Sequence, residues 1–146
     1  MTTVFIDTAI LMYAGGAPHE LRESSANIVR LARDGELDGV ISAEVVQEIL
    51  HRFVAIRRPD LGARMARDAL DLFAPVLPIT HAVMDRMPAL VGRYPSLAAR
   101  DLVHVATCLE EGIGVILSPD RGLDAVRELR RISPEDADAV HRLSQG

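Results

Sequence analysis

Short apolar runs alternate with longer stretches of helical periodicity along this sequence, and that alternation restricts the possible folds more than any other feature. Four of the runs are bounded by turn-forming residues and cover 3–6, 39–42, 75–79 and 114–118. Runs of this kind are typical of strands that are buried on both faces of a parallel sheet. A fifth and weaker candidate strand covers residues 129–132.

The stretches between these runs carry the i, i+3, i+4 spacing of amphipathic helices. They cover residues 19–34, 43–58, 60–73, 81–93 and 99–111. Within 43–58 the apolar stripe consists of Val45, Val46, Ile49, Leu50 and Phe53. Because strands that alternate with helices form crossover units, the sequence predicts an α/β fold with a parallel sheet flanked by helices.

The chain shows no internal repeat, low-complexity tract or linker between two apolar regions. Its 146 residues and 49% hydrophobic content suit one domain with a substantial core. We therefore expect a single domain over 1–146, with a core at about 3–133. Ser133 is a suitable N-cap and Pro134 a suitable first helical residue, so 134–146 is expected to be a capping helix or a tail.

The charge and cysteine content narrow the class of protein. The formal net charge is −5, and all 16 basic residues are arginines. A negative net charge makes a nucleic-acid partner less expected. It does not exclude one, because binding depends on the local electrostatic potential at the surface. The chain has no apolar run of 18 residues, no basic N-terminal region followed by a cleavage site, and one cysteine. We therefore expect a cytoplasmic protein without a membrane partner or a disulfide framework.

Four carboxylates occupy positions that a parallel α/β fold would bring together. Asp7 and Asp120 follow the first and fourth apolar runs, Glu48 lies two turns into the helix after the second run, and Asp101 lies in a first helical turn. Ligands of such sheets bind beyond the carboxyl ends of the strands. Because four carboxylates in one cleft repel one another, they need a cation, and oxygen donors favour Mg²⁺ or Mn²⁺. The pattern predicts metal-dependent hydrolysis of a phosphodiester.

Four segments together resemble the pattern of the PIN-domain nucleases: "VFIDTAILMYA", "ISAEVVQEIL", "ARDLVHVATCLEEG" and "VILSPDRGLD". The resemblance extends from about residue 3 to residue 124, and the size best suits the ribonuclease toxins of VapBC-type toxin-antitoxin modules. It implies that Asp7, Glu48, Asp101 and Asp120 are the acidic metal-binding quartet, with Thr8, Ser42 and Ser118 as supporting hydroxyls. It further implies a three-layer PIN-like fold with a five-stranded parallel sheet of order 3-2-1-4-5, endoribonuclease activity on RNA, homodimers, and inhibition by a small antitoxin.

Each acidic position also has a simpler explanation. Asp7 could be only the N-cap of the following helix, and Asp101 only a favourable charge in a first turn. Glu44, one turn before Glu48, is its rival. Asp124 competes with Asp120, and it could be an additional ligand or a neighbour of the ligands.

Two arginines and one histidine lie close in sequence to the proposed ligands. Arg100 and Arg121 could each hold a phosphate bidentately. His104 lies one turn after Asp101, and we expect it to be a partly buried structural histidine rather than a general base.

Other function classes fit less well. A phosphoryl-binding receiver domain would need a lysine, and a phosphatase of the haloacid-dehalogenase type would need an acid where this chain has Ala9. A PIN-like domain that binds partners without cleaving RNA is the third alternative.

Overall fold

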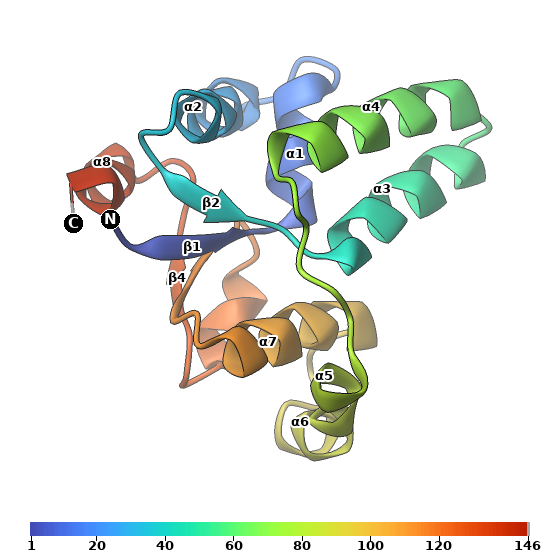
Figure 1. The fold of residues 1–146 in the computed structure, drawn as a ribbon, viewed down its shortest axis with the longest axis vertical. Coiled ribbons are helices and arrows are strands. Elements are labelled where there is room, and N and C mark those ends of the chain that lie inside the picture. Colours follow the sequence, from blue (N-terminus) through green and yellow to red (C-terminus); the bar gives the residue numbers. More distant parts are fainter. Residues whose placement is uncertain (146) are drawn as a thin grey trace.

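The computed structural model describes residues 1–145 and shows an α/β fold built on a parallel sheet (Figure 1). Its strands are β1 (Thr3–Ile6), β2 (Asp38–Val40), β3 (Val115–Leu117) and β4 (Arg130–Ile132). They pair in the order β2-β1-β3-β4, and every pairing is parallel. The predicted α/β class with a parallel sheet is confirmed, and β1 is an interior strand that pairs with β2 on one side and β3 on the other.

The prediction of five strands is wrong. The apolar run at 75–79 forms only a parallel bridge, in which Leu77 pairs with Ser42 beyond the end of β2. The Leu77 N–H donates to the Ile41 carbonyl at 2.9 Å, and the Leu77 carbonyl accepts from the Ala43 N–H at 2.8 Å. Pro75, two residues before Leu77, faces β2 but has no N–H to donate, so the ladder cannot extend on the N-terminal side of Leu77. The run therefore lies at the expected edge without forming a strand.

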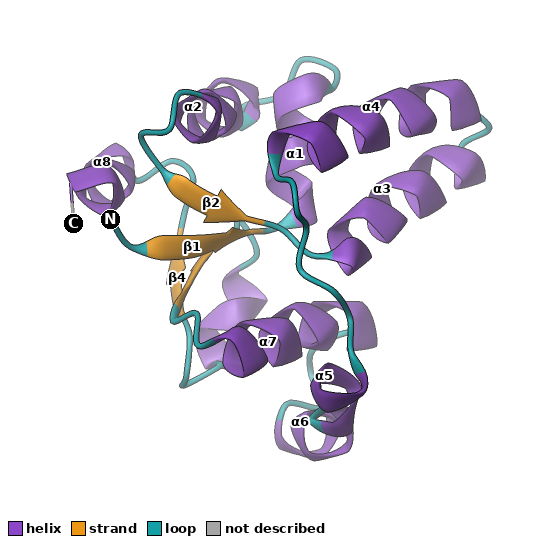
Figure 2. Ribbon diagram, viewed as in Figure 1, coloured by secondary structure: helices purple, strands orange, loops and turns teal. Residues whose placement is uncertain are grey.

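Helices cover both faces of the sheet (Figure 2). In the views shown, α1, α2 and α4 lie above the strands, α5, α6 and α7 lie below them, and α3 packs beside α4. Their bounds are α1 (Thr8–Gly15), α2 (Arg22–Arg33), α3 (Ala43–Ala55), α4 (Pro59–Leu72), α5 (His81–Asp85), α6 (Met87–Arg93), α7 (Ala99–Glu111) and α8 (Ala137–Gln145), with a short 3-10 helix η1 (Arg121–Ala125).

Two helix boundaries differ from the prediction for a clear backbone reason. The helix expected over 81–93 is divided at Arg86 into α5 and α6, because Pro88 has no N–H with which to continue the hydrogen-bonding pattern of α5. Helix α3 ends at Ala55, because Arg57 adopts a left-handed conformation with φ of 61°. The turn is closed by a 2.7 Å bond from the Arg58 N–H to the Phe53 carbonyl.

The C-terminal segment forms the expected helix, but Ser133 is not its N-cap. Asp136 takes that place, since its Oδ1 accepts from the Ala139 N–H at 3.0 Å, whereas Ser133 Oγ accepts only from the Glu135 N–H. Helix α8 buries Ala139, Val140 and Leu143 and packs near α2. Gly146, the last residue of the predicted segment, lies outside the described residues.

The core joins β1 to the helices on both sides. Val4, Phe5 and Ile6 are fully buried, as are Val105 on α7 and Ile49 on α3. Among the helices of residues 1–145, none combines the length and the apolar character needed to cross a membrane.

The end of β1 is fixed to its neighbour immediately beyond the last strand residue. The Asp7 N–H donates to the Leu117 carbonyl on β3 at 3.0 Å, and the Ser118 N–H donates to the Ile132 carbonyl on β4 at 3.1 Å. Because both contacts are made by buried backbone, the residues that follow β1 and β3 are held at one edge of the sheet.

Candidate active site

Asp7 occupies the junction between β1 and α1. Its backbone is extended, with φ of −67° and ψ of 149°, and its side chain makes no capping hydrogen bond to α1. The carboxylate instead accepts a 2.5 Å hydrogen bond at Oδ2 from Ser118 Oγ. Asp7 is only 7% exposed. Asp7 is thus the N-cap residue of α1 by position, but its carboxylate forms its side-chain hydrogen bond across the sheet to Ser118 and not a cap of α1.

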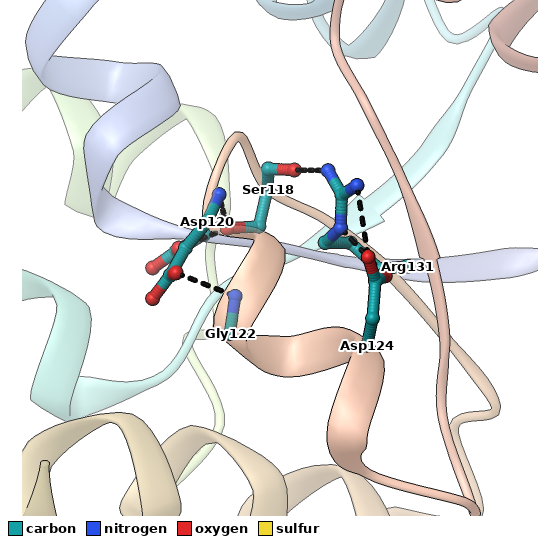
Figure 3. Close-up of polar contacts among 6 residues, drawn as sticks. Ser118, Asp120, Gly122, Asp124 and Arg131 are labelled. Carbon is teal, nitrogen blue, oxygen red and sulfur yellow. Dashed lines mark hydrogen bonds and ion pairs between the residues drawn. The ribbon is translucent and has the colours of Figure 1, made fainter. Parts of the chain in front are cut away.

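Ser118 connects Asp7 with the loop that carries Asp120. Its hydroxyl is fully buried, donates to Asp7 and accepts from the Asp120 N–H at 3.0 Å. The Asp120 carboxylate caps η1, since its Oδ1 accepts from the Gly122 N–H at 2.9 Å (Figure 3). Ser118 therefore fixes both the side chain at the end of β1 and the backbone of the loop after β3.

Asp124 faces away from the acidic positions. Its two carboxylate oxygens contact Arg131 Nε at 2.8 Å and Nη2 at 3.3 Å, and Arg131 Nη1 donates to the Ser118 carbonyl at 2.9 Å (Figure 3). Arg131 lowers the pKa of the Asp124 carboxyl below its usual range. Of the two rivals in this loop, Asp124 binds a cationic side chain of β4, whereas Asp120 is linked to Asp7 through Ser118.

Arg131 belongs to this arrangement, and the sequence did not reveal it. The side chain is 12% exposed although it lies on an edge strand. Arg130 and Arg131 stand side by side in the sequence, and only the packing of β4 against η1 distinguishes them.

Glu48 extends from α3 to the same edge of the sheet. Thr8 Oγ1 donates to Glu48 Oε1 at 3.1 Å, and His104 Nε2 lies 2.5 Å from that same oxygen. Glu44 makes no such contacts. Burial raises the pKa of its carboxyl, and the negative charge of Glu48 raises it further. The structure therefore places Glu48, rather than Glu44, in contact with the residues around Asp7.

His104 is more deeply buried than the sequence suggested. It is 1% exposed, and besides Glu48 its Nε2 approaches Asp7 Oδ1 at 3.7 Å. The prediction of a partly buried histidine is wrong in degree, since the ring is almost completely buried and both carboxylates approach it at Nε2.

The charges of the four acidic positions influence one another. Burial raises the pKa of the Asp7 carboxyl, although His104 and the Ser118 hydrogen bond oppose the shift. Burial also raises the pKa of the half-buried Asp101 carboxyl at the start of α7, and the charges of Asp7 and Asp120 raise it further. Carboxyls with raised pKa values and shared repulsion are stabilised in their charged form by a nearby cation.

The donor set fits a hard divalent cation by its chemistry. Carboxylate oxygens at an edge of the sheet are what Mg²⁺ and Mn²⁺ prefer. Within residues 1–145, however, no three Asp, Glu, His or Cys side chains are already gathered into a metal-binding group. A cation would therefore have to draw these carboxylates together from the positions described above.

The remaining predicted site residues make no side-chain hydrogen bond or ion pair with the acidic residues in the described chain. Ser42 is fully buried at the start of α3, but its hydroxyl has no hydrogen-bond partner within the described chain, so it does not support the acids in the way that Thr8 and Ser118 do. Arg100 and Arg121 are exposed. Neither forms an ion pair with another described residue.

The sequence is similar to known proteins along most of its length. The family model described as "PIN domain" matches residues 4–129. Ribonuclease VapC13 of Mycobacterium tuberculosis (strain ATCC 25618 / H37Rv) is 34% identical over 131 residues, which cover 89% of this chain and 99% of that protein. Ribonuclease VapC23 of Mycobacterium tuberculosis (strain CDC 1551 / Oshkosh) is 31% identical over 123 residues, covering 82% and 94%.

Solved structures show the same fold at lower identity. The crystal structure of FitAcB from Neisseria gonorrhoeae contains a chain with a TM-score of 0.67 and 19% identity, covering 91% of this chain and 99% of that one. The crystal structure of VapBC2 from Rickettsia felis, bound to a DNA fragment from their promoter, contains a chain with a TM-score of 0.69 and 12% identity, covering 90% and 98%.

Proposed function

Because this chain belongs to the PIN domain family and is related along most of its length to VapC ribonucleases, we propose that it is a metal-dependent endoribonuclease, the toxin of a VapBC-type toxin-antitoxin pair. The observation that carries the proposal is the link between Asp7 and the loop of Asp120 through one buried hydroxyl, with Glu48 and Asp101 at the same edge. Four chain segments thus bring acids to the same edge of the sheet, from which a cation would draw them together.

The chain's own residues have distinct tasks in this proposal. Asp7, Asp101 and Asp120 would hold one or two Mg²⁺ or Mn²⁺ ions, with Glu48 as a direct or water-mediated ligand. When bound, such a cation lowers the pKa of water and neutralises charge on a phosphoryl group. Ser118 and Thr8 hold Asp7 and Glu48 by hydrogen bonds, and Arg100 and Arg121 would bind the phosphates of RNA.

The partners follow from the same family membership. We propose RNA as the substrate, as the names of the related ribonucleases suggest, and a small antitoxin protein as the inhibitor, since a solved toxin-antitoxin complex from Klebsiella pneumoniae contains a chain of this fold. A homodimer and a cytoplasmic location complete the proposal.

RNA cleavage by the purified chain tests the proposed activity. We expect RNA cleavage in the presence of Mn²⁺ or Mg²⁺ and no cleavage in the presence of EDTA. Cleavage should return when Mn²⁺ is added in excess of the EDTA. The products should carry 5′-phosphate and 3′-hydroxyl ends. Asp7→Asn should abolish cleavage while preserving the fold, because the two side chains have nearly the same shape.

The control variant is Asp138→Asn, because Asp138 is an exposed carboxylate on α8. Cleavage by Asp7→Asn at the wild-type rate would refute the proposed role of the acids. Stable phosphorylation of Asp7 by acetyl phosphate would favour a phosphoryl-binding function instead.

A further inference from the structure

His104 is a buried polar residue, and its polar contacts are with the carboxylates of Glu48 and Asp7. It is 1% exposed and lies on α7 between Val103 and Val105, which are also buried. A polar group in such a position costs free energy unless it has a partner. The contacts of His104 with Glu48 and Asp7 are therefore the interactions that an apolar residue at this place could not make.

The ring is held in one orientation. Its centroid lies 5.3 Å from that of Phe5 on β1, with an angle of 44° between the ring planes. Nδ1 and Nε2 are both buried and neither makes a hydrogen bond of standard geometry with a described residue, but Nε2 makes a close contact of 2.5 Å with Glu48 Oε1. An N–H at Nε2 can donate to this carboxylate whether the ring is neutral or charged.

Two side chains approach the same oxygen of Glu48. Thr8 Oγ1 donates to Oε1 from α1, and His104 Nε2 reaches Oε1 from α7. Because both contacts are made at Oε1, they fix the carboxylate from two directions and leave Oε2 for a cation or a water molecule.

We propose that His104 is a positioning residue, which holds the Glu48 carboxylate beside Asp7 in the orientation that metal binding needs. This inference rests on the proposed metal-dependent activity. It gives His104 a role in metal binding, in addition to its place in the packed core. Residues that orient metal ligands typically change metal affinity by about 10- to 100-fold when they are replaced.

The sharpest test compares two amides at position 104. In His104→Gln the amide nitrogen can take the place of Nε2 and still reach Glu48, whereas in His104→Asn it lies closer to the backbone and cannot. Titration calorimetry with Mn²⁺ should show affinity near wild type for the glutamine variant and, for the asparagine variant, a loss on the order of 10-fold or more. His51→Asn is the control, because His51 is exposed on α3, one turn after Glu48.

A double-mutant cycle decides whether His104 acts through Glu48. If it does, adding His104→Asn to Glu48→Gln should weaken Mn²⁺ binding no further than Glu48→Gln alone. Thermal unfolding of every variant identifies any that fails to fold, and the glutamine variant then carries the comparison.

The outcomes separate this inference from the proposed function. Wild-type Mn²⁺ affinity in His104→Asn, equal losses in the asparagine and glutamine variants, or additive losses in the cycle would each overturn the positioning role. A wild-type chain that binds Mn²⁺ but cuts no RNA would refute the ribonuclease proposal alone, because the Mn²⁺ affinities would still test His104.

Discussion

Ser118 Oγ lies 2.5 Å from Asp7 Oδ2, although 111 residues separate the two in the chain. The pair joins the ends of two neighbouring strands, β1 and β3, and Ser118 also accepts from the Asp120 N–H. One buried hydroxyl therefore satisfies a carboxylate and a backbone donor together.

Ser118→Ala should destabilise the fold and impair metal binding. Removing the hydroxyl leaves the Asp120 N–H without its acceptor and Asp7 without its donor, at a cost of about 1–3 kcal/mol. Chemical denaturation measures this loss. The matched control is Ser25→Ala, because Ser25 is equally buried but its hydroxyl has no hydrogen-bond partner in the described chain. The Ser25 variant should be as stable as wild type or more so, and equal losses in both variants would contradict the assigned role of Ser118.

Asp7→Asn should stabilise the metal-free chain at neutral pH. Burial raises the pKa of this carboxyl above its usual value of 3.8, so the folded chain binds the proton more tightly than the unfolded chain. Stability of the wild type is then lost as pH rises from about 3.8 through the raised value. Asparagine removes this loss, and the difference between the two proteins should shrink as pH falls. Thermal melts in EDTA from pH 4 to 8 measure it, and a constant difference across that range would contradict the prediction.

Arg131→Met should loosen the loop that carries Asp120. The guanidinium bonds Asp124 and the Ser118 carbonyl from a largely buried position, so we expect a loss of about 1–3 kcal/mol in the free energy of unfolding, with weaker RNA cleavage. Arg130→Met is the control, because Arg130 is the exposed neighbour on the same strand. If both variants lose equal stability, the contacts of Arg131 are not what holds the loop.

Arg100→Ala and Arg121→Ala should raise the KM for RNA and leave the melting temperature unchanged. Both arginines are exposed and have no ion-pair partner in the described part of the chain, so little folding energy depends on them. Each lost phosphate contact should reduce the slope of log affinity against log salt concentration by about 0.7. Arg142→Ala on α8 is the control, and an unchanged salt dependence in both test variants would exclude phosphate contacts by these residues.

Cys108 should resist thiol reagents while the protein is folded. It is fully buried on α7, and burial, together with the charge of Asp7, raises the pKa of its thiol to about 12. Because the thiolate is the reactive form, labelling should follow the opening of α7. The rate of labelling with a disulfide reagent, measured across urea concentrations, reports that opening. Rapid labelling without denaturant would show that α7 is less firmly packed than described.

Local patterns in the sequence predicted most of the elements. The apolar runs at 3–6 and 114–118 contain β1 and β3, and the periodic stretch at 99–111 matches α7. The errors lie at 75–79 and at Pro88, where a proline lacks the backbone N–H that a strand or helix needs. The spacing of apolar residues takes no account of this missing donor.

The sequence predicts that acidic residues lie at one edge of the sheet. It does not predict which side chains contact them. Strand order brings Asp7 and Ser118 together, and the chain order of the motifs anticipated this. The contacts of His104 with Glu48 depend on how α7 packs against α3, and those of Arg131 with Asp124 on how β4 packs against η1. Such pairings arise from packing between distant segments, which no local pattern encodes.

The single bridge at Leu77 also affects how the molecule behaves towards its own copies. An exposed edge with regularly spaced N–H and C=O groups can recruit a strand from another chain and begin aggregation. Here Pro75 and Pro78 supply no donors, and the Leu77 N–H is already bonded to the Ile41 carbonyl, so Val76 has the one remaining N–H of residues 75–78. A second chain would find few donors at this border, so Pro75 and Pro78 disfavour the addition of a strand from another copy along this edge of the sheet.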